Sequence, residues 1–161
     1  MRASVIRQNG GALQSLINRV AGMHGKQIVV GVPEGKIHTV SENGKTYTMS
    51  MSLLANIHEF GSPSRNIPAR PFLIKTLKDN QEKYVDLIKS NTWKMITRKL
   101  DPDVFLARLG MLAVRDVQAY MVNGQFKPLA EITIARKGSS KPLIDTGQLR
   151  QSITYMVERK K

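Results

Sequence analysis

The feature that most constrains the fold is a long stretch of helical periodicity that is broken once, at Asp101-Pro102-Asp103. From Phe72 to about Leu100, apolar residues recur three and four positions apart, as on one face of an α-helix. Asp101 suits the N-cap of a second helix, because Pro102 and Asp103 are both favourable in a first helical turn. The second apolar stripe ends before Asn123-Gly124 and consists of Leu106, Leu109, Ala113, Val117 and Tyr120. The pattern predicts two long helices, joined sharply, at the centre of the structure.

Three segments in the first third of the chain have the composition of β-strands. Gln27 to Val32 is a short run rich in β-branched residues. Ile37 to Val40 and Thr46 to Met49 flank Asn43-Gly44, a dipeptide that accepts the positive φ angles of a tight hairpin turn. These segments predict a three-strand meander with an exposed hairpin loop.

A closing strand is predicted near the C-terminus, because apolar and polar residues alternate there. One face would be buried and would carry Ile153, Tyr155 and Val157. If this strand joins the meander, the result is an α+β fold. We therefore expect a small antiparallel sheet, made of the meander plus the C-terminal strand, packed against two long helices and shorter N-terminal helices.

Two shorter helices are expected before the long pair. Ala12 to Val20 has apolar residues at helical spacing. Ser50 or Ser52 can cap a second short helix that ends at Gly61, where a left-handed residue suits the C-terminus. Its apolar face consists of Leu53, Leu54, Ile57 and Phe60.

The composition is that of one soluble domain. The chain has 161 residues, of which 41% are hydrophobic and 23% charged, so we expect a single domain over residues 1–161. No apolar run approaches the roughly 18 to 20 residues that cross a bilayer, so we expect neither membrane association nor export. The absence of cysteine excludes disulfides and thiolate metal sites. Residues 137–141 are polar and are expected to form a flexible loop.

The chain is strongly basic, with a formal net charge of +13 and a sequence pI near 10.3. Arg159-Lys160-Lys161 makes the C-terminal end basic as well. An excess of this kind favours contact with phosphate, anionic lipid or an acidic protein surface. Surplus lysine that only keeps the surface solvated explains the charge equally well, and the sequence leaves both interpretations open.

Two segments carry a resemblance to a known protein family. The first reads IHEFGSP from Ile57 and IPARPFL from Ile67, and the second reads KPLIDTGQLRQSI from Lys141. They resemble the HEFG…IPARPF and PLIDTGQLRxSI segments of the phage virion morphogenesis family. That family comprises small tail-completion and tail-terminator proteins at the neck of long-tailed bacteriophages. The segments occur in the family's order, with a long helical stretch between them.

The resemblance implies a structural virion protein of the phage neck, assembled in the host cytoplasm. Such a protein would form a homo-oligomeric ring, expected to be hexameric, at the head-proximal end of the tail tube. The ring would complete or terminate the tail and join it to the head. Its partners would be the tail-tube protein and the head–tail connector proteins, with genomic DNA passing close by in the channel.

Residue types that carry catalysis or bind metals do not cluster in the sequence. His24, His38 and His58 lie in different predicted elements, and no paired carboxylates accompany them. His58-Glu59 comes closest to a hydrolase pair, but adjacent residues on a helix point about 100° apart. We therefore expect no enzyme activity, no metal and no cofactor.

The alternative function is a sequence-neutral nucleic-acid-binding protein that acts through its basic surface. Against it stands an aromatic content of 6%, with no cluster on which bases could stack. A small hydrolase that uses His58 is a third possibility, and no constellation of residues supports it.

Arginines in the two resembling segments are candidates for assembly contacts. Arg70 lies between Pro68 and Pro71, so a fixed backbone presents its guanidinium for bidentate pairing with a carboxylate. That carboxylate is either Glu59 of the same subunit or a group on a neighbour. Arg150 lies either on a solvated helix face or at a joint between subunits.

Two further residues complete the candidate set. Asp145 is expected to cap the short helix that carries Arg150, with Gln148 reaching back in a capping-box arrangement. Trp93 lies out of phase with the apolar stripe, so it faces either a neighbour or the core. The candidate assembly residues are His58, Glu59, Arg65, Arg70, Trp93, Asp145 and Arg150.

Overall fold

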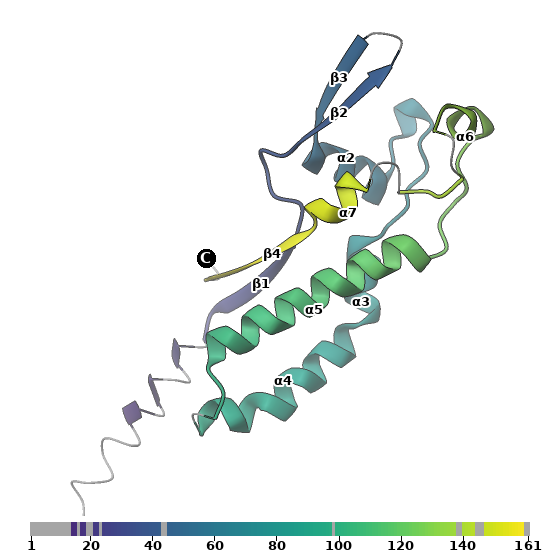
Figure 1. Ribbon diagram of the computed structural model, residues 1–161. Coiled ribbons are helices and arrows are strands. Elements are labelled where there is room, and N and C mark those ends of the chain that lie inside the picture. The colour runs from purple at the N-terminus through teal and green to yellow at the C-terminus, as the bar shows by residue number, and fades with distance from the viewer. Residues whose placement is uncertain are drawn as a thin grey trace, which may run out of the picture.

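The structure, a computed structural model, describes residues 14–15, 17–18, 21–22, 24–42, 45–97, 99–137, 140–143 and 147–159. It confirms the α+β class, with small antiparallel sheets and predominant helices (Figure 1). The strands are β1 (Lys26–Gly31), β2 (Ile37–Glu42), β3 (Lys45–Ser50) and β4 (Thr154–Arg159). The helices are α2 (Met51–Phe60), the short 3-10 helix η1 (Pro63–Arg65), α3 (Leu73–Asp79), α4 (Gln81–Ile96), α5 (Pro102–Asn123), α6 (Glu131–Lys137) and α7 (Gln148–Ser152).

Helix α5 is the long element against which the others pack. Figure 1 shows β1 and β4 along one side of it and α3 and α4 along the other. The Asp101 carboxylate caps α5 by accepting the backbone N–H groups of Asp103 at 2.8 Å and Val104 at 3.2 Å. Pro102 occupies the first turn and the helix ends at Asn123. Both predicted ends of this helix are confirmed.

The other long helix is divided in two. α3 stops at Asp79 and α4 begins at Gln81, because Asn80 leaves helical geometry with φ -99° and ψ 8°. The Asn80 side chain donates to the carbonyl of Thr76 at 2.9 Å, a local bond of the kind that competes with helix continuation. The single helix expected from Phe72 to about Leu100 is therefore wrong, although both of its parts are helical.

The three-strand meander is also wrong, because the described strands form two separate ribbons. β1 pairs antiparallel with β4, from Lys26 opposite Arg159 to Gly31 opposite Thr154, while β2 pairs only with β3. The linker between β1 and β2 contains Gly35 at φ 86°, a conformation that glycine adopts readily. It leads the chain away from β1, and the hairpin of β2 and β3 extends beyond the helices in Figure 1.

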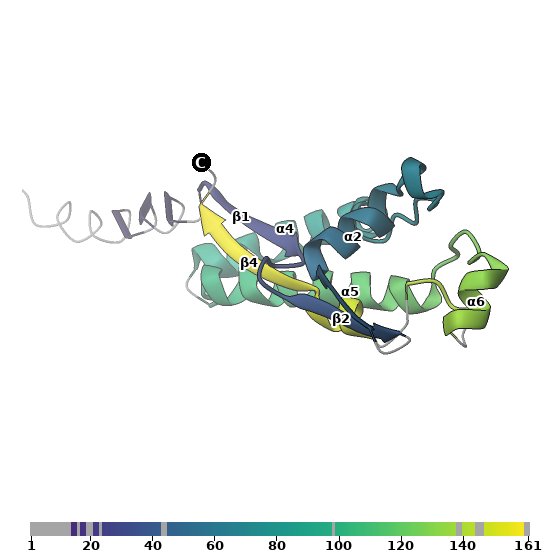
Figure 2. The ribbon, with the colours of Figure 1, turned by 90° about the horizontal axis from the view of Figure 1, so that it is seen from above.

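The ribbon of β1 and β4 packs one of its faces against α5, so buried and exposed side chains alternate along β4. Tyr155 and Val157 are partly buried and alternate with exposed neighbours, so the predicted closing strand and its buried face are confirmed. Figure 2 shows the two strands running side by side across the helix layer. Long-range pairing of β1 with β4 therefore closes the structure, in place of the local pairing expected of a meander.

Close contact between α5 and this ribbon depends on Gly110. A Cβ atom at this position would lie 2.3 Å from Cδ2 of Tyr155. Carbon atoms in contact ordinarily lie about 3.5 to 4.0 Å apart, so only glycine lets the ring rest on the helix backbone. Gly110 and Tyr155 thus set the distance between helix and sheet.

The buried apolar residues form two clusters, both along α5. The larger joins segments far apart in the sequence and contains Met51, Phe72, Val117, Met121, Leu143, Leu149 and Ile153. The smaller joins α4 to the first half of α5 and contains Met95, Phe105 and Leu109. No helix in the described ranges is both long and apolar enough to cross a bilayer.

Several predicted features fall wholly or partly outside the described residues. Of the helix expected from Ala12 to Val20, the described residues 14, 15, 17 and 18 are helical. The turn Asn43-Gly44 lies outside, but Glu42 opposite Lys45 leaves only those two residues to connect the strands. Of the loop expected at 137–141, residue 137 ends α6 and residues 138 and 139 lie outside.

Candidate assembly surface

Three of the predicted assembly residues meet where the end of α2 faces the loop that leads to α3. They are His58, Glu59 and Arg70. The backbone N–H of Arg70 donates to the carbonyl of His58 at 2.7 Å, which ties the loop to the last turn of α2. We call this region the α2–α3 junction.

Glu59 caps the start of α3 from a different helix. Its side chain is buried, and its two carboxylate oxygens accept the backbone N–H groups of Phe72, Leu73 and Ile74, each at 2.9 Å. The first N–H groups of a helix have no acceptor within the helix itself. A carboxylate at this end also meets the positive end of the helix dipole. Glu59 therefore fixes α3 relative to α2.

Arg70 is buried to 4% exposure and bonds to main-chain carbonyls. Its Nε donates to the carbonyl of Lys127 and its Nη2 to that of Pro128, both at 2.8 Å. Burial lowers the pKa of the Arg70 guanidinium from its ordinary value. No ion pair joins Arg70 to Glu59 in the described ranges, so the intramolecular pair weighed in the sequence analysis is wrong. Arg70 instead holds the segment after α5 against the loop.

The loop between α2 and α3 has a rigid, locally determined shape. Gly61 has φ 78°, and a Cβ atom there would lie 2.8 Å from the backbone nitrogen of Ala69, so this position requires glycine. Ser62 and Ile67 bridge the loop through two backbone hydrogen bonds, at 2.8 and 3.0 Å. Arg65, at the end of η1, is exposed. These contacts are in line with the expected rigid loop, and the loop presents Arg65 to solvent.

The outer face of α2, defined by Leu53, Ile57 and Phe60, is apolar and turned away from the core. Leu53 is 50% exposed and Phe60 is 66% exposed. The residues that α2 buries are Met51 and Glu59, on the opposite side. Of the apolar face predicted from the sequence, Leu54 packs against the core, whereas Leu53 and Phe60 are exposed.

Ile74 is a further exposed apolar residue, at the start of α3. Its side chain is 53% exposed, while its backbone N–H bonds to Glu59. Because Glu59 belongs to α2, the position of Ile74 relative to the outer face of α2 is fixed. Lys78, one turn further along α3, is also exposed and places a positive charge beside Ile74.

The remaining candidates lie elsewhere. Trp93 on α4 is 71% exposed, so the core position considered for it is wrong. Arg150 lies half-buried on α7, and its carbonyl accepts a bond from Nε2 of Gln118 at 3.0 Å. α7 packs beside α2, whereas α4 lies across α5 from both in Figure 1. Asp145 lies outside the described residues, and the N-cap of α7 is Gly147, with no side-chain capping bond.

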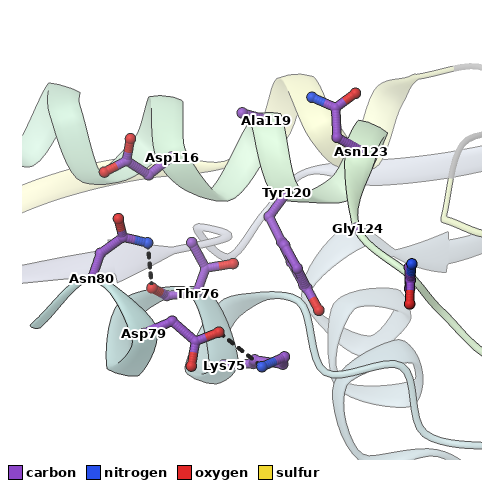
Figure 3. Close-up of a pocket in the computed structure, with 10 residues that line it drawn as sticks. Lys75, Thr76, Asp79, Asn80, Asp116, Ala119, Tyr120, Asn123 and Gly124 are labelled. Carbon is purple, nitrogen blue, oxygen red and sulfur yellow. Dashed lines mark hydrogen bonds and ion pairs between the residues drawn. The ribbon is translucent and has the colours of Figure 1, made fainter.

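A shallow groove of about 670 Å³ lies between α3 and the end of α5 (Figure 3). Asp79 pairs there with Lys75 at 2.8 Å, and this hydrogen bond raises the pKa of the lysine. Asp116 accepts bonds from Lys83 at 2.6 Å and from the Tyr84 hydroxyl at 2.9 Å. Burial, and then the bond to Asp116, raises the pKa of Tyr84. The carboxylates of the groove are thus engaged by neighbours.

The described residues offer few groupings suited to a metal site or to catalysis. In the part of the chain that the structure describes, no three side chains of the metal-binding types gather into a group. The three histidines lie on different segments, and His38 contacts Gln148 through its Nδ1 at 2.8 Å. The hydrogen bonds of Glu59 and of the Arg70 backbone at the α2–α3 junction hold α2 in a fixed position relative to α3.

The sequence analysis missed the outward orientation of α2. A signal was present, because the apolar residues of this short helix extend over more than half of its circumference. An apolar stripe wider than the face that packs against the core leaves some of its residues exposed. Its apolar residues are Met51, Leu53, Leu54, Ala55, Ile57 and Phe60.

Comparison with known proteins found no matching family model, no matching curated protein and no matching solved structure.

Proposed function

We propose that this chain is a structural virion protein of the phage neck. It forms a homo-oligomeric ring at the head-proximal end of the tail tube, completes or terminates the tail, and joins it to the head. The proposal starts from the resemblance of the two quoted segments to the virion morphogenesis family. It is supported by what those segments do in the fold, since one of them builds the α2–α3 junction.

The observation that carries the proposal is the exposed outer face of α2. Across the described residues, more large apolar side chains are exposed than buried, and Phe60 at 66% is among the most exposed. Each Å² of apolar surface removed from water contributes about 25 cal/mol, so an apolar face held open favours a partner that covers it.

The junction behind this face makes it a preformed surface. Glu59, Arg70 and Gly61 each hold the backbone through buried bonds or a conformation that only glycine adopts. A surface that is ordered before contact loses less entropy when a partner binds. The fold therefore supports an assembly role for α2.

Because the chain has a net charge of +13, we expect its partner to be acidic. Lys78 and Arg65 are exposed close to the junction in sequence, so an apolar surface bordered by acidic residues would complement them. The tail-tube and head–tail connector proteins are the proposed partners, and genomic DNA passes near the ring in the channel.

The test mixes the purified chain with the tail-tube protein of the same virus and follows ring formation by native mass spectrometry and electron microscopy. A ring that caps tube ends is the expected result. The double variant Leu53→Ser and Phe60→Ser should stay folded and fail to join the tube. Met111→Ser, an equally exposed residue on α5, is the matched control and should join normally.

Two outcomes would contradict the proposal. One is a chain that remains monomeric at all concentrations with and without tube protein. The other is tight binding to DNA of any sequence in the absence of a ring, which would favour the nucleic-acid-binding alternative.

A further inference from the structure

The ribbon of β1 and β4 has an open edge on each side. Within the described residues, no backbone hydrogen bond joins β1 or β4 to any segment except the other strand of the pair. α5 covers one face of the ribbon, and the remaining face is open. Each six-residue strand thus keeps an outer row of backbone donors and acceptors for a further strand.

Two of the features that usually block edge pairing are absent from both strands, and their charged residues, Lys26, Glu158 and Arg159, lie together at one end of the pair. No proline or bulge interrupts β1 or β4, and the two strands pair position by position along their full length. A two-stranded ribbon is also the smallest sheet, and this one is stabilised on one face by packing against α5, while its two edges stay free in the described part of the chain. The edges are therefore suited to accept another strand.

We propose that β4 of one copy pairs antiparallel with β1 of the next copy, so that the ribbons of a ring join into one continuous sheet. This inference rests on the proposed function, because it names the contact that closes the ring. The occupant is a second copy because pairing of the free edges in the same register would place the same side chains opposite one another as in the internal pair. Val29 lies opposite Met156 in the internal pair, and the Gln27 side chain donates to Glu158 at 2.8 Å.

The geometry of this contact is head-to-tail. Each copy uses two different edges, one from β1 and one from β4, so contacts of one kind repeat around an axis and close into a ring. Pairing of β1 with β1, or of β4 with β4, would instead give a two-fold dimer. Because antiparallel pairing preserves the two faces of a sheet, α5 of every copy would lie on the same side.

The opposite side of that sheet would be poor in positive charge. The uncovered face of the ribbon carries Gln27, Val29, Gly31, Thr154, Met156 and Glu158. This face has no lysine or arginine, and its one charged residue, Glu158, is acidic. If it lines the opening of the ring, DNA would pass a surface that does not bind phosphate.

The test uses the absence of cysteine from the chain. Two proteins, Val29→Cys and Met156→Cys, are mixed in equal amounts, assembled with tail-tube protein, oxidised gently and examined under denaturing conditions. The expected result is a covalent species of twice the subunit mass that contains one copy of each variant. Cysteines at positions 27 and 31, paired with cysteines at 154 and 158, cover shifted registers.

Controls separate the possible contacts. Either variant alone should stay at the single subunit mass, since head-to-tail pairing keeps identical positions apart. Dimers from one variant alone would indicate two-fold pairing and would overturn the proposal. Thr48→Cys on β3, mixed with Val29→Cys, should give no dimer, because the hairpin has no part in this contact.

Hydrogen exchange gives an independent readout on the unmodified chain. Assembly should slow amide exchange in residues 26–31 and 154–159 together. Rings that form without cross-links and without this protection would overturn the inference and leave the proposed function intact. Failure of the unmodified chain to form any ring would overturn both.

Discussion

The inner and outer faces of α2 differ from those of an ordinary surface helix, which buries apolar residues and exposes charged ones. Its inner face contains the charged group, Glu59, which is buried and fully engaged by backbone N–H groups. Its outer face contains Leu53 and Phe60, which are half or more exposed. Glu59 and Met51 stabilise the fold, and we propose that Leu53 and Phe60 serve contacts outside the subunit.

If the proposed assembly role is right, this difference separates stability from assembly on one helix. Changes on the inner face should lower the free energy of unfolding of the isolated chain. Changes on the outer face should leave that quantity nearly unaltered and reduce binding. The predictions below test this division, beginning with the largest expected change in stability.

Glu59→Ala should be the most damaging of these changes to the isolated chain. It leaves three buried or partly buried N–H groups without an acceptor, so we expect a loss of about 3 kcal/mol in the free energy of unfolding. Urea denaturation at neutral pH measures this quantity. Glu59→Gln, which keeps one acceptor oxygen, should fall between wild type and Glu59→Ala, and Glu34→Ala in an exposed loop should match wild type.

Arg70→Met should lower the free energy of unfolding by about 2 kcal/mol, somewhat less than Glu59→Ala. Two charge-assisted hydrogen bonds are lost, but the methionine side chain takes the place of the aliphatic part of the arginine. The matched control is Arg65→Met, an exposed arginine of the same loop, which should change stability by no more than about 0.5 kcal/mol. Equal midpoints for the two variants in denaturant would show that the buried bonds of Arg70 contribute nothing.

Changes on the outer face should affect the isolated chain least. For Leu53→Ser with Phe60→Ser we expect a change below about 1 kcal/mol in unfolding, since both side chains already contact water. Affinity for the tail-tube protein should fall at least about tenfold, measured by sedimentation or calorimetry. By contrast, Met51→Ser on the inner face should lower the free energy of unfolding by about 3 kcal/mol. A large loss of stability in the outer variant would remove the distinction between the faces.

A small effect is expected from pH at a site remote from α2. The pKa of Tyr84 is raised by burial and by its bond to Asp116, so the folded state favours the neutral phenol. This contribution to stability is complete below the ordinary tyrosine pKa of about 10 and is lost as the pH rises above it. Tyr84→Phe should therefore show a shallower fall in stability between pH 9 and 11 than wild type, as followed by denaturant unfolding.

The parts of the fold that depend on local signals could be predicted from the sequence. Asp101 and Pro102 start α5, Ser50 caps α2 by accepting the N–H of Leu53, and Gly61 ends α2 with a positive φ. Each of these rests on a residue whose preference is set within one turn of chain. The α+β class followed from such elements together.

Contacts between distant segments were not predicted. The sequence contains no local signal that β1 pairs with β4, 123 or more positions away, in place of its neighbour β2. The opposite charges of Arg70 and Glu59 made Glu59 one of the two partners considered for Arg70. Each found backbone groups instead, and those of Lys127 and Pro128 reach Arg70 only once α5 is folded.

Gly110 has a mechanical consequence for any assembly built on this subunit. The Tyr155 ring rests against the helix backbone at that residue, so β4 cannot slide along α5 without lifting the ring out of place. Bending or sliding at the helix therefore displaces the strand as well. If neighbouring copies are joined strand to strand, a force on α5 of one copy is transmitted through its β4 to the next copy. The joined sheet would then resist deformation as a single ring.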